Sequence, residues 1–137
     1  MRMASPAQAL RVRALETLVW ISAWTVLALA LVGSLTPQEA TEPSFSDKLT
    51  HALDYTALCS LFLLAAVWLP LRGTGRFPNS AGAVMVAIAA VGVVIEILQG
   101  FVGRSVDVLD VAANMVGCLC GRLLWGALRG ALSERSL

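Results

Sequence analysis

The sequence predicts an all-α fold, a compact bundle of four transmembrane helices with both termini in the cytoplasm. Three observations lead to this prediction: the apolar composition, four apolar stretches of membrane-spanning length, and the placement of the basic residues. Apolar residues make up 58% of the 137 residues and charged residues only 14%, whereas soluble domains are about half apolar and a quarter charged. A soluble globule of this size could not hide so much apolar surface, so we expect lipid to solvate much of it.

Each of the four stretches has the length that crosses a bilayer, about 20 mostly apolar residues. They cover approximately residues 15–35, 49–71, 81–102 and 108–128, and together they form one domain, 1–137. Turn-forming residues separate them: prolines in 36–46, glycines and a proline in 72–80, and a glycine at 103. The first stretch follows basic residues as a signal peptide would, but its apolar core is longer than a signal core. We therefore expect it to be retained as a helix.

The basic residues predict the orientation, because cytoplasmic loops carry an excess of lysine and arginine. One side of the predicted bundle holds Arg2, Arg11, Arg13, Arg72, Arg76, Arg122, Arg129 and Arg135, and the other holds only Lys48 and Arg104. The tryptophans, as interfacial anchors would, fall toward the arginine-rich ends of the stretches: Trp20, Trp24, Trp68 and Trp125. The sequence thus predicts a multi-pass protein of the plasma (inner) membrane.

Charge and cysteine usage exclude further classes of function. The net charge is +1 and the basic residues form no patch, so nucleic-acid binding is not expected. Cys59, Cys118 and Cys120 lie in apolar stretches without the spacing of a disulfide framework or of a zinc or redox motif. They are expected to pack as small apolar side chains. We expect no cofactor and no metal site.

Polar residues recur within the last three stretches, near their predicted outer ends. Such residues are costly in lipid and usually face a bundle interior or a wet cavity. Their steps of three and four place them on one face of each helix. They are Asp47, His51, Asp54 and Tyr55 in the second stretch, Glu96 and Gln99 in the third, and Asp107, Asp110 and Asn114 in the fourth, with Gly117 and Gly121 below. The two glycines would let a neighbouring helix approach closely.

A purely structural explanation stays open for part of this set. Asp47 and Asp107 could cap helix N-termini, and Asn114 could hydrogen-bond across the bundle. Glu96 is different, because it follows an apolar run and lies far from a helix start. A buried carboxylate there needs a partner, and the nearby cationic candidates are Lys48, His51 and Arg104.

Two strings of the sequence resemble a known family. Asp47-Lys48-Leu49-Thr50-His51, followed by Tyr55, resembles the Asp-Lys-x-x-His-x-x-x-Tyr signature that opens the second helix of VanZ-like membrane proteins. The stretch from 96 to 117 is similar to that family's Glu-x-x-Gln…Gly-Arg-x-x-Asp-x-x-Asp-x-x-x-Asn-x-x-Gly pattern, which is carried here by Glu96, Gln99, Gly103, Arg104, Asp107, Asp110, Asn114 and Gly117. The chain departs from the family at Ala52, where an aromatic residue is frequent, at Asp54, which adds a carboxylate, and at Val102, where a proline commonly precedes Gly-Arg. The resemblance implies a small multi-pass envelope protein, and the family takes its name from a member linked to teicoplanin resistance.

Three functions follow as alternatives. The first is binding of a cell-envelope or lipid-linked molecule in an outward pocket, with phosphate or carboxylate paired to Arg104 and Lys48. The residues expected to line this pocket are Lys48, His51, Tyr55, Glu96, Gln99, Arg104, Asp107, Asp110 and Asn114. The second is an enzyme acting on such a lipid, with His51, Glu96 and Asp110 as the acid–base candidates. The third is a structural or assembly partner without a small ligand, for which the glycine pairs 117/121 and 126/130 could form a homo-oligomer.

Overall fold

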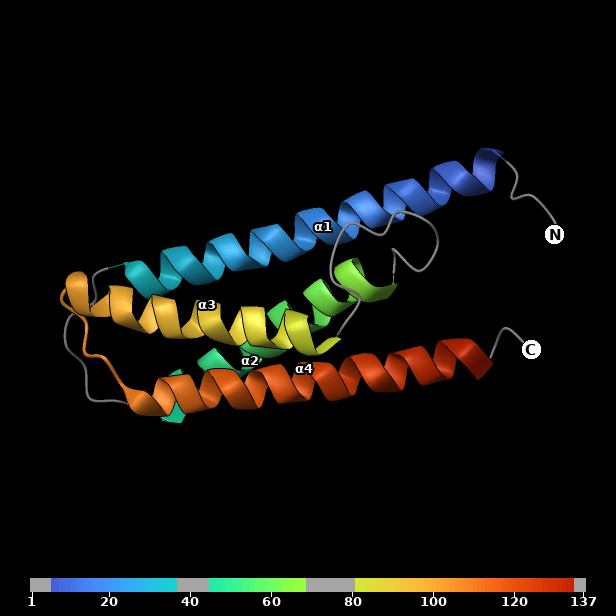
Figure 1. Cartoon of the computed structure of the whole chain (residues 1–137). Helices are drawn as coiled ribbons and strands as arrows, with labels where there is room; N and C mark the ends of the chain where they lie inside the picture. The colour runs from blue at the N-terminus through green and yellow to red at the C-terminus, as the bar shows by residue number, and fades with distance from the viewer. Residues whose placement is uncertain (1–5, 37–44, 69–80, 135–137) are drawn as a thin grey trace.

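The computed structural model describes residues 6–36, 45–68 and 81–134, and these ranges are helical apart from short turns. They contain α1 (Pro6–Leu35), α2 (Phe45–Leu63), α3 (Ala81–Phe101) and α4 (Val108–Glu134), and a π-helical turn, η1 (Leu64–Trp68), continues α2 (Figure 1). Four helices are long and apolar enough to cross a membrane, and no strand occurs in the described ranges. The predicted all-α fold with four transmembrane helices is confirmed.

The helices extend beyond the apolar stretches that predicted them. α1 begins nine residues early, at Pro6, a residue type favoured in the first helical position. α2 begins at Phe45, so Asp47 lies inside its first turn and not at its cap. α4 continues six residues past 128, to Glu134. Apolar composition marks only the part of a helix that lipid solvates, whereas backbone hydrogen bonding continues into polar sequence. The predicted segments 37–44 and 69–80 lie outside the described residues.

Successive helices run in opposite directions along the bundle (Figure 1). The start of α1 and the end of α4 lie at one end. At the other end, here called the polar end, α1 and α3 finish and α2 and α4 begin. Because the number of candidate spans is even, the first and last described helical residues lie at the same end of the bundle. Which side is cytoplasmic remains a prediction, and Arg2, Arg72, Arg76 and Arg135 lie outside the described residues.

The closest helix pair is α2 with α4, and glycines make this approach possible. A Cβ atom added at Gly117 would lie 2.4 Å from the carbonyl oxygen of Ala52, and one at Gly121 would lie 2.7 Å from that of Thr56. The two helix backbones are therefore in direct contact, as the Gly-x-x-x-Gly spacing predicted. This contact brings the first turns of α2 and α4 together at the polar end.

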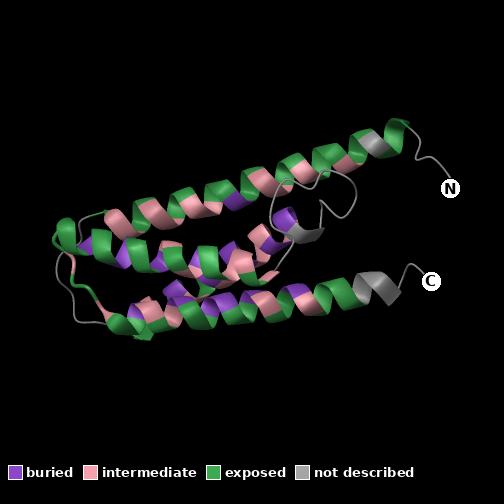
Figure 2. Cartoon of the chain, in the orientation of Figure 1, coloured by how far each residue is buried: buried purple, intermediate pink, exposed green. Residues whose placement is uncertain are grey.

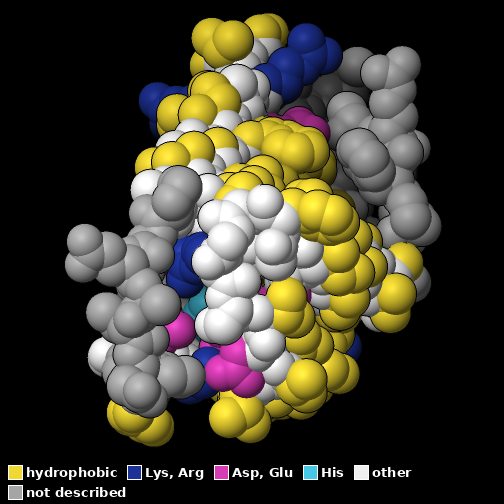
Figure 3. Space-filling model, turned by 90° about the vertical axis from the view of Figure 1, so that its left-hand side faces the viewer, with side chains coloured by type: hydrophobic (Ala, Val, Ile, Leu, Met, Phe, Trp, Pro, Cys, Tyr) yellow, Lys and Arg dark blue, Asp and Glu magenta, His cyan; other side chains and the backbone are white. Residues whose placement is uncertain are grey.

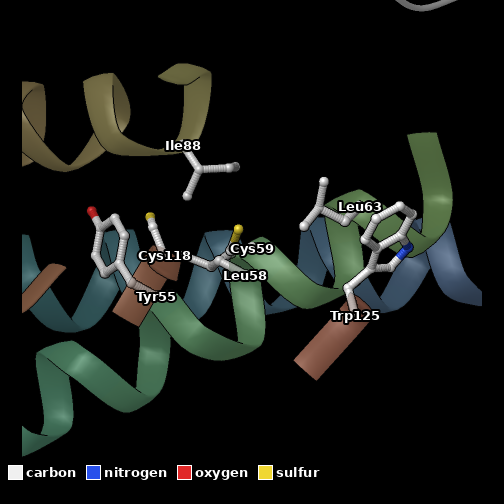
Figure 4. Close-up of a cluster of buried hydrophobic side chains, with 7 residues drawn as sticks. All are labelled: Tyr55, Leu58, Cys59, Leu63, Ile88, Cys118 and Trp125. Atoms are coloured by element: carbon white, nitrogen blue, oxygen red, sulfur yellow. The ribbon is translucent and has the colours of Figure 1, made fainter. Parts of the chain in front are cut away.

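Below the polar end, the core is a cluster of side chains centred on α2. It consists of Tyr55, Leu58, Cys59 and Leu63 on α2, Ile88 on α3, and Cys118 and Trp125 on α4 (Figure 4). The burial of Cys59 and Cys118 in this cluster fits the prediction that the cysteines pack as apolar side chains, whereas Cys120 is exposed. Trp125 is only 5% exposed, so it is a core residue and not the lipid-facing anchor expected from the sequence.

α1 is the least buried helix of the bundle (Figure 2). Its Trp20 and Trp24 pack edge-on against Phe62 of α2, with ring centroids 5.9 and 5.5 Å apart. α1 therefore covers α2 from one side and leaves most of its own surface to the surroundings.

Candidate functional site

At the polar end, α4 is preceded by a capping residue. Asp107 stands directly before α4, and its Oδ1 accepts a hydrogen bond from the backbone N–H of Leu109 at 2.8 Å. This is the geometry of an N-cap, so the predicted capping role of Asp107 is confirmed. The cap places Asp110 in the first turn of α4 and Asn114 one turn further along, on the face toward α2.

Lys48 of α2 joins the two aspartates of α4. Its Nζ donates to Oδ2 of Asp107 and to Oδ1 of Asp110. The side chains are shielded from solvent, with relative exposures of 19% for Lys48, 22% for Asp107 and 7% for Asp110. The Lys48 ammonium, together with the Leu109 N–H, holds the pKa of Asp107 below its ordinary value of 3.8. An ammonium between two carboxylates neutralises charge that would otherwise be costly at this depth.

His51 lies one turn below Lys48, between two residues of α4. Its Nδ1 is 3.2 Å from Oδ1 of Asn114, and its Nε2 is 3.7 Å from Oδ2 of Asp110. All three side chains are buried. In the tautomer whose Nδ1–H donates to Asn114, Nε2 is the nitrogen that faces the Asp110 carboxylate. The predicted cross-bundle hydrogen bond of Asn114 is thus present, and its partner is His51.

The side chain of Glu96, on α3, contacts the backbone of Asp107 in the same region. It is 2% exposed, and its Oε2 accepts a hydrogen bond from the backbone N–H of Asp107 at 3.3 Å. Its Oε1 has no hydrogen-bond partner among the described residues. The expectation of a cationic partner is wrong for Lys48 and for Arg104, because Lys48 binds the two aspartates and Arg104 binds carbonyl groups of α1.

Gln99 and Arg104 hold the end of α1. Nε2 of Gln99 donates to the carbonyl oxygen of Ser34, and Nη1 of Arg104 donates to those of Gly33 and Ser34, each at 3.2 Å. Carbonyl groups in a last helical turn lack intrahelical partners and favour nearby cations. The turn after α3, with Gly103 at a φ of 81° and the Arg104 N–H bonded to the Gln99 carbonyl, directs the arginine toward α1. Both residues therefore have a structural task that the sequence did not reveal.

Tyr55 does not join the other predicted ligand residues. It is 3% exposed and belongs to the core cluster (Figure 4). Its ring lies against α3, where a Cβ atom added at Gly92 would be 3.0 Å from the hydroxyl oxygen. That hydroxyl has no hydrogen-bond partner among the described residues. Tyr55 is thus buried below the polar end and is not positioned to meet a molecule from outside.

We call the connected side chains the polar network: Lys48, His51, Glu96, Asp107, Asp110 and Asn114. The network includes the three acid–base candidates, and it lies where acidic, basic and imidazole side chains gather when the molecule is viewed from the polar end (Figure 3). Three helices do present polar groups to one another at one depth, as the spacing predicted. Most of these groups are already bonded to one another, which limits what they can offer to a ligand.

A groove of about 500 Å³ adjoins the network between α1 and α2. Two of the predicted ligand residues, His51 and Arg104, line it. The complete lining is Val26, Leu29, Ala30, Gly33, Ser34, Asp47, Thr50, His51, Asp54, Ala57 and Arg104. The α1 wall could not be predicted from the sequence, because apolar residues in an apolar stretch carry no distinguishing signal. Asp54 could have been included, since its spacing from His51 already placed it on the polar face.

The same region has three donor groups that could hold a cation. One ligand atom from each of Asp47, His51 and Asp110 lies within 4.8 Å of the others. The sequence analysis named no metal site, and spacing alone could not have shown this convergence of α2 with α4. The Lys48 ammonium already bonds Oδ1 of Asp110 and would compete with any added cation.

Comparison with known proteins agrees with the motif resemblance. The model of the VanZ/LLP1 family matches residues 35–129, more than half of the chain, from the end of α1 through most of α4. No curated protein and no solved structure matches the chain significantly.

Proposed function

This chain belongs to the VanZ/LLP1 family, and we propose that it is a multi-pass plasma-membrane protein that binds a cell-envelope or lipid-linked molecule at its polar end. In this proposal both termini are cytoplasmic, as the arginine distribution predicts, so the polar end faces the outside of the cell. The bilayer is then a partner of the whole bundle, and the envelope molecule is a partner of the polar end.

The observation that supports ligand binding is the groove beside the polar network. Ionisable residues within spanning helices are costly and commonly mark a ligand path. Here they occur next to a groove whose volume, about 500 Å³, is typical of small-molecule sites. The Lys48 ion pairs join α2 to α4, and Asn114 of α4 contacts His51 of α2 where it lines the groove.

A role in glycopeptide resistance, teicoplanin resistance in particular, is part of this proposal and rests on the family. In this proposal the envelope ligand binds at the outer membrane surface, which is also where such an antibiotic would meet the protein or its target. The experiment uses a strain that lacks the gene, complemented with the wild-type chain, His51→Ala, Arg104→Gln or Arg104→Lys. Teicoplanin susceptibility, envelope integrity and protein level are measured together.

We expect His51→Ala and Arg104→Gln to lose the complemented phenotype at wild-type protein level, and Arg104→Lys to retain part of it, because lysine keeps the charge but loses the planar fork. Arg11→Gln at the opposite end is the charge-matched control. A wild-type phenotype in His51→Ala and Arg104→Gln would refute ligand binding at the groove. An unchanged teicoplanin response with altered envelope integrity would refute only the role in resistance.

An enzyme acting on a lipid-linked substrate is the second candidate, and one observation favours it. The imidazole of His51 is oriented by Asn114 at Nδ1, has Asp110 on the side of Nε2, and lines the groove. A positioned imidazole of this kind could exchange a proton with a bound substrate, and Glu96 would be a second acid or base. Turnover of a labelled envelope lipid by purified protein, lost in His51→Ala and Glu96→Gln, would support this function. Stable binding without turnover would exclude it for that lipid.

The third candidate, an assembly partner without a ligand, gains less support. The Gly117 and Gly121 pair is already covered by α2 within the bundle. A Cβ atom added at Gly130 would meet no atom within 4 Å, so this part of α4 leaves room for a second copy. The oligomeric state of purified Gly130→Leu compared with wild type tests this alternative directly.

A further inference from the structure

The groove between α1 and α2 changes from polar to apolar along its length. On α2, Asp47, Thr50, His51 and Asp54 line it first, and Ala57 follows. From residue 47 to residue 57, at a rise of about 1.5 Å per residue, this wall is roughly 15 Å long. On α1 the backbone of Gly33 and Ser34 lies near the polar end, where Arg104 binds it, and the wall continues to Val26 toward the middle of the helix. This order matches a lipid whose head lies at the membrane surface and whose chain points inward.

The apolar part of the groove is accessible from outside the bundle. Leu29 of α1 lines it and is 66% exposed. A chain lying against Leu29, Val26 and Ala57 would therefore reach the groove sideways from the lipid phase and would need no opening of the bundle.

The charges in the polar part select among head groups. Asp54 contributes a carboxylate and Arg104 contributes a guanidinium. A head group with only negative charge would meet the carboxylate, and one with only positive charge would meet the guanidinium. A head group that carries one positive and one negative charge satisfies both. Lys48 does not change this balance, because its ammonium is bonded to Asp107 and Asp110 and does not line the groove.

Arg104 retains donors for an anion. Both of its contacts to α1 are made by Nη1, so the N–H groups on Nε and on Nη2 can serve a phosphate. The two carbonyl contacts fix the direction of the guanidinium. Asp54, half-buried one turn below Thr50, can accept hydrogen bonds from an ammonium group.

We propose that the groove binds a phospholipid with a zwitterionic phosphoethanolamine head group: the phosphate lies at Arg104, one acyl chain runs from it along the α1 wall, and the ethanolamine arm folds back along the α2 wall to bring its ammonium to Asp54. This inference rests on the proposed function and names the class of its ligand. It also assigns Asp54 and the α1 wall to the site.

The test measures binding to the purified full-length protein in detergent, using lipids that differ only in the head group. A chain-labelled phosphatidylethanolamine is titrated and then displaced by unlabelled phosphatidylethanolamine, phosphatidylglycerol, or water-soluble phosphoethanolamine. We expect phosphatidylethanolamine to bind about tenfold or more tightly than phosphatidylglycerol, the ratio that one additional favourable charge contact of about 1.4 kcal/mol gives. Soluble phosphoethanolamine should compete weakly, because it lacks the chain.

Two variants locate the selectivity. Asp54→Asn should reduce the preference for the amine lipid to about one, and Arg104→Lys should weaken both lipids, because the phosphate is common to them. Glu16→Gln on α1, outside the groove, is the carboxylate control and should leave both affinities unchanged. Thermal unfolding of each variant shows whether the fold is retained, and Asp54→Glu, which keeps the charge, should keep the preference.

Equal affinity for the two lipids, or an amine preference that persists in Asp54→Asn, would overturn the inference. If the lipids bind equally while His51→Ala still loses the cellular phenotype, the head-group assignment fails and the proposed function survives. If the amine preference and its loss in Asp54→Asn are found without any cellular phenotype, the inference stands and the proposed function fails.

Discussion

The contact between α2 and α4 at Gly117 gives a direct test of how the polar network is positioned. Replacing Gly117 by alanine adds one Cβ atom, which would lie 2.4 Å from the backbone oxygen of Ala52 and 2.8 Å from Cβ of Tyr55. Neither neighbour can move away by a simple side-chain rotation, because one is backbone and the other is attached directly to it. The helices must separate for the alanine to fit.

The size of the effect follows from these distances. Ordinary contact begins at 3.4 Å, so the backbones must part by 3.4 − 2.4 = 1.0 Å at this point. One turn away, the same shift would take the pair His51 Nδ1 and Asn114 Oδ1, now 3.2 Å apart, out of hydrogen-bond range. Overpacking of a core costs about 1–3 kcal/mol, and losing Gly from a helix interior returns about 1 kcal/mol. With the His51 contact also lost, at about 1 kcal/mol, we expect Gly117→Ala to lower the free energy of unfolding by about 2 kcal/mol.

Equilibrium unfolding in detergent, followed by circular dichroism, measures this change. A loss of about 2 kcal/mol lowers the ratio of folded to unfolded protein by roughly 30-fold. Gly130→Ala is the matched control on the same helix, because its Cβ would meet no atom within 4 Å; it should be stabilising by up to about 1 kcal/mol. If Gly117→Ala were as stable as Gly130→Ala, the close approach of α2 and α4 would be incorrect.

Three further predictions concern the polar network. Lys48→Met leaves the carboxylate of Asp110 buried without the ammonium that pairs with it and should cost about 3 kcal/mol of unfolding free energy. A double-mutant cycle with Asp110→Asn should show positive coupling, and additive effects would contradict the ion pair. The lowered pKa of Asp107 means that its contribution to stability is complete above pH 3.8, the ordinary value, and is lost as the pH falls through the lower folded-state pKa. Unfolding measured between neutral and strongly acidic pH should therefore show an acid-dependent loss that is smaller in Asp107→Asn. Glu96→Gln keeps an acceptor for the Asp107 N–H and should change the free energy of unfolding by less than about 1 kcal/mol. Glu96→Ala leaves that N–H without its partner and should cost about 1–3 kcal/mol. Equal losses in the two variants would show that the charge of Glu96, and not its acceptor oxygen, matters.

The fold was largely accessible from the sequence, because a bilayer imposes a minimum length on any apolar helix that crosses it. The close approach of two helices at Gly117 was also predictable, since only a missing side chain permits it. The helix ends were less accessible. α1 and α4 continue well past their apolar stretches, and nothing in hydropathy marks where backbone hydrogen bonding stops.

The partners of the polar residues were only partly predictable. Helical spacing placed His51, Asp110 and Asn114 on facing surfaces, and they do meet. Spacing could not show that Arg104 turns toward carbonyl groups of α1, because this depends on the turn at Gly103 and on where α1 ends. A hydrogen bond from a side chain to a backbone carbonyl leaves no pattern in the residue types of its acceptor.

At the polar end, some residues join α2 to α4 and others line the groove, and this difference limits what family membership indicates about the ligand. Three of the motif residues, Lys48, Asp107 and Asp110, are bonded to one another and join α2 to α4. The groove beside them is bounded by α1, of which only Leu35 falls within the residues matched by the family. Asp54, where the chain departs from the family pattern, also lines the groove. Lys48, Asp107 and Asp110 thus hold the scaffold, while the groove combines the motif residues Asp47, His51 and Arg104 with Asp54 and the α1 wall. The VanZ/LLP1 motif therefore identifies the framework and part of the groove wall, and the decisive substitutions lie at Asp54, outside the motif, and at Arg104, within it.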